Sequence, residues 1–192
     1  TIADVRKHFQ QLYSPRDSIL SVAGKIDWPR LKETVERLLG NWQSAGQPRP
    51  QATQQPRKYQ HLEAESSQTH IGIALDSVSY SHPDYFQIRG AVGVLSDGMS
   101  SRLFTEVREK RGLCYSVYAS YESQRDRAAV LCYAGTAADR AQQTLDVTLD
   151  EIRRLGRDGI ETEELETMRA GLKSSLIMQQ ESSMSRSGSL AP

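Results

Sequence analysis

The stretch that decides the fold is "VLSDGMSSRLFTEVREKRGLCYSVYASY", residues 94 to 121. Its first part places apolar residues at helical spacing from about Ser100 and stops at Gly112, a common helix end. Its last part is rich in tyrosine and valine, which favour strands. Four charged residues, 108 to 111, stand where the two patterns meet. The stretch therefore predicts a helix followed by a strand, with a polar cluster at the junction.

The flanking sequence extends this pattern in both directions. Before the stretch, "HPDYFQIRGAVGVLSDG" has apolar residues at helical spacing up to Gly98, and "YQHLEAESSQTHIGIALDSV" indicates one or two strands. After it, "LCYSVYASYE" and "AAVLCYAGTA" flank a charged turn and predict an antiparallel hairpin. Two amphipathic helices follow, one over residues 141 to 152 and one from Thr162. The fold class is therefore α+β, with a mixed or antiparallel sheet packed against several helices.

The sequence also predicts how the chain is divided. Residues 1–42 indicate a helix capped by Thr1, a strand in "SILSVAGKI" at 18–26, and a helix capped by Asp27. Residues 43–58, rich in proline and glutamine, are typical of an exposed linker. Residues 59–192 form the second domain, whose polar tail ends without a final strand. We expect residues 1–42 to be too few to close a core alone.

Composition excludes several classes of partner. Lys+Arg and Asp+Glu each number 24, so no net positive charge favours nucleic acid. No apolar run is long enough to span a membrane, so no membrane partner is expected. The first residue is not Met, and we expect the chain to be a piece of a longer, soluble protein. Cys114 and Cys132 are either buried core residues or a disulfide between neighbouring strands, and they allow a bacterial cytoplasm or a periplasm, of which we favour the periplasm.

The residues of common catalytic centres are scattered. The four histidines, His8, His61, His70 and His82, lack the short spacings of a metal site, so no metal ligands are predicted in this chain. His61, Glu63 and Glu65 alternate as expected for the exposed face of a strand. The serine motif Gly-x-Ser-x-Gly is missing from the sequence.

The stretch from 94 to 121 resembles the second-domain signature of the pitrilysin/insulinase zinc peptidases, in the branch that includes the mitochondrial processing peptidase. "YSPRDSILSVAGKID", "HPDYFQIRGAVGVL" and "GIETEELETMRAGLKSSL" extend the resemblance over nearly the whole chain. It implies that residues 1–42 end a first αβ repeat and that residues 59–192 form most of a second. The family's zinc motif, His-x-x-Glu-His, belongs to the first repeat and is expected upstream or on a partner subunit.

The resemblance also implies roles for individual residues. Arg108 and Tyr115, seven positions apart, match a catalytic pair that faces the zinc and binds the substrate and its oxyanion. From the pattern alone, charges 108 to 111 are typical of a solvated helix end, and Arg111 keeps that interpretation. Gly112 would let the chain turn so that both side chains point the same way.

Gly98, Ser100 and Ser101 are the remaining substrate-binding residues that the resemblance implies. Ser96 and Asp97 depart from the family, which has a run of glycines there. We expect Asp97 to adopt the left-handed backbone conformation, Ser96 to fit poorly, and the edge to be less open to the substrate backbone.

Two functions remain open at this stage. In the first, the chain is the C-terminal, substrate-binding part of a zinc-dependent metalloendopeptidase that acts on peptides or unfolded proteins, and it is inactive alone. It would work as a homodimer or as a heterodimer with a zinc-bearing subunit. In the second, the fold serves as a non-catalytic core-like subunit or as a peptide-binding or assembly module.

Overall fold

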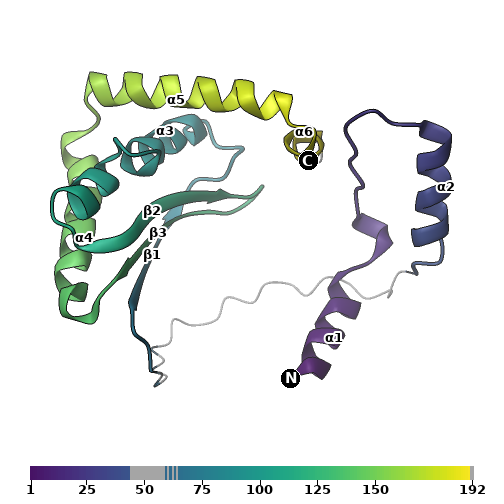
Figure 1. Cartoon of the computed structure of the whole chain (residues 1–192), viewed down its shortest axis with the longest axis horizontal. Helices are drawn as coiled ribbons and strands as arrows, with labels where there is room; N and C mark the ends of the chain where they lie inside the picture. The colour runs from purple at the N-terminus through teal and green to yellow at the C-terminus, as the bar shows by residue number, and fades with distance from the viewer. Residues whose placement is uncertain (44–58, 60, 62, 64, 191–192) are drawn as a thin grey trace. The chain divides into compact units, whose positions relative to one another are not determined.

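The computed structural model describes residues 1–43, 59, 61, 63 and 65–190 (Figure 1). The chain divides into two compact units. The first contains Thr1–His61 and Leu176–Pro192, and the second contains Leu62–Ser175. Residues 44–58, nearly all of the predicted linker, lie outside the described residues, so the linker stays a prediction.

Two helices of the first unit begin where the sequence predicts. In α1 (Ile2–Leu12), Thr1 and Asp4 form a reciprocal capping box. In α2 (Trp28–Leu39), the Asp27 carboxylate accepts a hydrogen bond of 3.1 Å from the Arg30 amide. A short 3₁₀ turn (Pro15–Asp17) and helix α6 (Ser183–Leu190) complete the regular structure described for this unit.

The strand predicted at residues 18–26 is wrong. This segment forms no strand with any of the described residues, because a strand exists only where a neighbouring backbone completes its hydrogen-bonded ladder. The Ser21 hydroxyl in this segment donates a hydrogen bond to the Ser187 carbonyl in α6. The alternating apolar pattern therefore could not show that a partner strand was lacking among the described residues.

The second unit is built on a three-stranded antiparallel sheet in the order β1-β3-β2. The strands are β1 (Thr69–Ser77), β2 (Cys114–Ser123) and β3 (Ala128–Thr136). β2 and β3 form the predicted hairpin, and β1 pairs with β3 from Thr69↔Thr136 to Ser77↔Ala128. The α+β fold class with an antiparallel sheet is confirmed.

Helices cover one face of this sheet. Figure 1 shows α3 (Tyr85–Ser96) between the sheet and α5 (Thr162–Glu181), with α4 (Ala141–Asp158) beside them. α3 and α5 approach each other closely at Gly93, which has no side chain. A Cβ atom at this position would come within 2.9 Å of Met168. A short 3₁₀ turn (Ala138–Arg140) joins β3 to α4.

The quoted stretch supplies most of the core beneath these helices. Leu103 and Val107 have no exposed surface, and the buried cluster also contains Val92, Leu95, Leu113, Ala119 and Cys132. The predicted apolar stripe of α4 is only partly buried, whereas Thr144 and Thr148 are buried more deeply. Their hydroxyl groups donate to the carbonyls of Arg140 and Thr144, one turn earlier, which satisfies them without water.

Replacing Leu103 tests this packing. Leu103→Ala should lower the free energy of unfolding by about 2–5 kcal/mol, because it removes buried methyl groups and leaves a cavity. Urea unfolding followed by circular dichroism measures the change. Leu131→Ala, on the exposed side of the sheet, is the matched control and should cost less than about 1 kcal/mol. Equal losses in the two variants would contradict the assigned core.

Candidate functional site

The helix that carries Arg108 contains a π-helical turn, Phe104–Glu109. Its signature is the hydrogen bond of 2.9 Å from the Lys110 amide to the Thr105 carbonyl, five residues earlier instead of four. The helix ends at Gly112, whose φ of 58° is the left-handed conformation that glycine adopts readily. Single π turns occur frequently at functional sites, so the backbone geometry makes this segment a candidate functional site.

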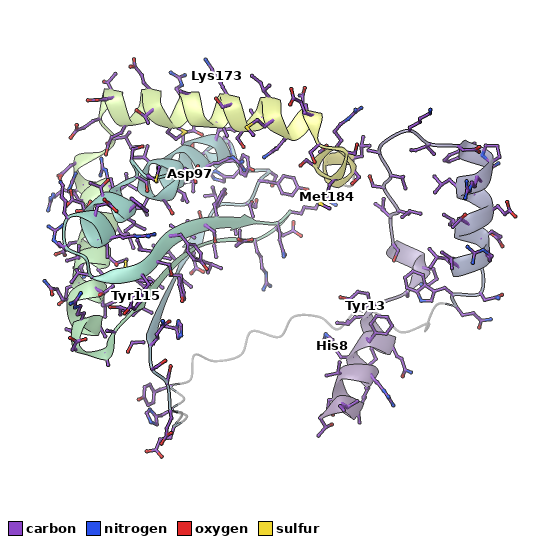
Figure 2. All side chains as sticks on the ribbon, in the orientation of Figure 1. His8, Tyr13, Asp97, Tyr115, Lys173 and Met184 are labelled. Atoms are coloured by element: carbon purple, nitrogen blue, oxygen red, sulfur yellow. The ribbon has the colours of Figure 1, made fainter. Side chains whose placement is uncertain are left out.

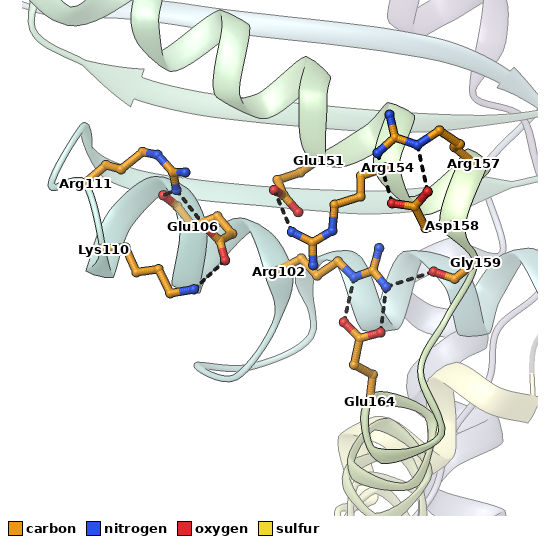
Figure 3. Close-up of polar contacts among 10 residues, drawn as sticks. All are labelled: Arg102, Glu106, Lys110, Arg111, Glu151, Arg154, Arg157, Asp158, Gly159 and Glu164. Carbon is orange, nitrogen blue, oxygen red and sulfur yellow. Dashed lines mark hydrogen bonds and ion pairs between the residues drawn. The ribbon is translucent and has the colours of Figure 1, made fainter.

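The charged residues of "REKR", 108 to 111, differ in their contacts, and two of them form ion pairs within the helix end. The Glu106 carboxylate binds Lys110 Nζ at 2.7 Å and Arg111 Nη1 at 2.6 Å, as Figure 3 shows. These two contacts hold the pKa of Glu106 below its ordinary value, with the Lys110 hydrogen bond as the larger cause. Lys110 and Arg111 are therefore engaged in the helix end itself, which agrees with the structural role expected of Arg111.

Arg108 differs from these neighbours. It is exposed, and its side chain makes no hydrogen bond or ion pair with any residue in the described part of the chain. Its guanidinium carbon instead lies 5.0 Å from the centroid of the Phe104 ring. The donors of this guanidinium are consequently available to an external acceptor.

Tyr115 is exposed by an irregularity in β2. Cys114 lies opposite Thr136 and Ser116 lies opposite Gly135, so Tyr115 is an extra residue with no partner across the strand pair. Its side chain is 67% exposed and stands at the start of β2 in Figure 2. The Tyr115 hydroxyl makes no hydrogen bond within the described residues. The bulge thus presents a phenol to solvent a few residues beyond Arg108.

The structure decides between the two interpretations of the cysteines. Both thiols are free, and Cys114 pairs across the sheet with Thr136 while Cys132 pairs with Ala119. This register excludes a disulfide between them. Burial raises the pKa of the Cys114 thiol, and the Arg108 cation opposes that shift.

Gly98, Ser100 and Ser101 line a different place, a cavity of about 620 Å³ between the end of α3 and the start of α5. Neither Arg108 nor Tyr115 lines this cavity. In Figure 2, Asp97 beside the cavity and Tyr115 lie well apart. The five residues predicted for the site therefore fall into two separate groups.

The departure at Ser96 and Asp97 causes no backbone strain. Asp97 has a φ of −81°, and Gly98, with a φ of 82°, takes the left-handed position instead. Ser96 is the last residue of α3, and its hydroxyl accepts a hydrogen bond of 2.7 Å from the Ala119 amide in β2. The expectation that Ser96 fits poorly and that Asp97 turns left-handed was wrong, because Ser96 ties the helix end to the sheet.

Sequence reasoning missed the buried ion pair beside this site. Arg102, 6% exposed, binds both oxygens of Glu164 at 2.6 Å and donates to the Gly159 carbonyl at 2.8 Å (Figure 3). The pair raises the pKa of Arg102 and lowers that of Glu164. It joins the start of α5 to the helix of the quoted stretch. Only the long-range fold brings these residues together, so no local pattern in the sequence pointed to the pair.

No group of three His, Cys, Asp or Glu side chains suited to a metal ion occurs among the described residues. The residues present therefore do not fit a zinc site. In the same part of the chain, no helix is long and apolar enough to cross a bilayer.

Comparison with known proteins identifies the family. Residues 1–172 match the model of the peptidase M16 inactive domain. The "uncharacterized zinc protease YmxG" of Bacillus subtilis is 33% identical over 192 residues, which are 96% of this chain and 46% of the relative. A Mycobacterium tuberculosis protein, "uncharacterized zinc protease Rv2782c", is 29% identical over 97% of this chain and 44% of its own length. The chain thus spans less than half the length of these relatives.

Solved structures share the fold. A peptidase M16 inactive domain from Pseudomonas fluorescens superposes with a TM-score of 0.61 and 25% identity, over 79% of this chain and 38% of the other. A protease from Helicobacter pylori superposes with a TM-score of 0.72 and 17% identity, over 98% of this chain and 48% of the other. The second match concerns the fold alone.

The Glu106 contacts predict a pH dependence of stability. Because the folded-state pKa of Glu106 is lowered, its contribution is present above the ordinary glutamate pKa and is lost as the pH falls through the lower, folded value. Glu106→Gln should cost about 1 kcal/mol of unfolding free energy at neutral pH and much less near pH 3, by urea unfolding. The exposed Glu122→Gln serves as control and should show neither effect. A loss for Glu106→Gln that is constant with pH would contradict the ion pairs.

Proposed function

Because the chain belongs to the family of the peptidase M16 inactive domain, we propose that it forms the C-terminal, substrate-binding part of a zinc-dependent metalloendopeptidase. The name of the matching domain and the zinc proteases among its relatives support this proposal. The chain would be inactive alone, and zinc would be held by another region of the enzyme or by a partner subunit. Peptides and unfolded proteins are the proposed substrates.

The observation that carries the proposal is the availability of Arg108 and Tyr115. Both are exposed on either side of Gly112, and neither side chain hydrogen-bonds to a described residue, whereas Lys110 and Arg111 are engaged by Glu106. An arginine fork suits the carbonyl groups of an extended peptide, and a phenol hydroxyl can donate to a developing oxyanion. Together they would bind the substrate and stabilise its transition state.

The zinc of such an enzyme would supply an activated water. This chain's own contribution would be limited to hydrogen-bond donation: Arg108 orients the substrate backbone, and the Tyr115 hydroxyl donates to the oxygen on which negative charge develops. Since these donors and the zinc would come from different parts of the assembly, we propose a homodimer or a heterodimer with a zinc-bearing subunit. Gly98, Ser100 and Ser101 would contact substrate elsewhere on this unit, away from the reacting bond.

Substitution of the two donors tests this function in the native, zinc-loaded protein. Arg108→Ala and Tyr115→Phe should each lower kcat by about 100-fold, because each removes a donor to the substrate or oxyanion. Hydrolysis of a fluorogenic peptide measures this, and a zinc chelator should abolish the activity. Arg153→Ala and Tyr80→Phe, which change exposed residues of the same types, are the matched controls.

The outcomes separate the candidate functions. Normal kcat in Arg108→Ala and Tyr115→Phe would remove the catalytic pair from the proposal. Activity that appears only after addition of a zinc-bearing partner would identify a complementing subunit. Peptide binding without hydrolysis under any of these conditions would favour the non-catalytic binding or assembly module.

A further inference from the structure

We infer that Phe104 is a positioning residue that holds the Arg108 guanidinium ready for substrate, an inference that rests on the proposed function. The two residues are four apart in the π-helical segment, and the guanidinium carbon lies 5.0 Å from the centroid of the phenyl ring. At this separation the face of an aromatic ring attracts a cation, and the planar guanidinium also stacks on it.

The ring contact matters because Glu106, a carboxylate on the same helical segment, is already occupied. Glu106 binds Lys110 and Arg111, and its side chain is only 13% exposed. Arg108 has no carboxylate partner in the described chain, and its guanidinium lies over the phenyl ring instead. Unlike a carboxylate, a ring uses none of the five N–H donors in hydrogen bonds, so it restrains the side chain and leaves the donors for substrate.

The position of the charge supports the same conclusion. The Arg108 cation favours a lower pKa of the Cys114 thiol, which lies at the start of β2 next to Tyr115. The charge of Arg108 therefore influences the beginning of the strand that carries the phenol. A long side chain loses much rotational freedom when it binds, and a contact that restricts it beforehand reduces this loss.

The first experiment is a double-mutant cycle on peptide hydrolysis by the native, zinc-loaded protein. Phe104→Leu keeps apolar volume but removes the ring, and it should lower kcat/KM about two- to five-fold. Phe104→Tyr keeps an aromatic ring, and its kcat/KM should stay close to that of the wild type. In the Arg108→Ala background, Phe104→Leu should have no further effect. An equal loss in both backgrounds would show a merely structural role and overturn the inference.

The second experiment does not depend on activity. The Arg108 Nε–Hε resonance, assigned with Arg108→Ala, should be shifted upfield by the Phe104 ring in NMR spectra of the protein. The shift should disappear in Phe104→Leu and persist in Phe104→Tyr and in Phe86→Leu, a control on the exposed Phe86 of α3. An Arg108 resonance that is unchanged in Phe104→Leu would overturn the inference.

The two readouts keep this inference distinct from the proposed function. If the native protein hydrolyses no peptide, the proposed function fails, and the NMR comparison still decides whether Phe104 orients Arg108. If hydrolysis depends on Arg108 but the Phe104 variants change neither readout, the proposed function stands and the positioning role is wrong.

Discussion

The architecture of the site depends on the burial of Leu103 and Val107. These side chains, four residues apart on one helix and without exposed surface, fix that helix against the sheet. Among the other positions of this helix, some are paired and some are exposed. Arg102 is paired with Glu164, and Arg108 is exposed. The burial of these two apolar residues therefore accompanies a division of the arginines, with Arg102 paired and Arg108 exposed.

Polar groups then refine an arrangement that the apolar core defines. The Thr136 and Thr144 hydroxyl groups lie within hydrogen-bond distance of the Leu113 carbonyl, immediately after the Gly112 turn. Ser96 holds the end of α3 against β2 through the Ala119 amide. These contacts anchor the backbone that follows the turn, so the segment between Arg108 and Tyr115 is held at Leu113 rather than left as an open loop.

Local patterns in the sequence predicted the elements whose determinants lie within a few residues. The caps at Thr1 and Asp27, the hairpin of β2 and β3, and the turn at Gly112 belong to this class. The remaining features need partners distant in sequence or small shifts in hydrogen bonding. Residues 18–26 lack a pairing strand among the described residues, and Arg102 meets Glu164 only in the folded unit. The exposure of Arg108 and Tyr115 also comes from the fold, because the charge pattern alone is equally typical of a solvated helix end.

The π turn has a consequence for how relatives are aligned with this chain. A hydrogen bond that spans five residues accommodates one residue more than an α-helical turn. A relative with a one-residue gap within 104–109 would regain α-helical geometry there, and the side chains after the gap would keep their orientation, because the π turn absorbs the extra residue. An arginine in such a relative is therefore equivalent to Arg108 when it stands at the same distance before the glycine that ends the helix. The distance from Gly112, as much as the identity of the residue, therefore determines whether the arginine is equivalent.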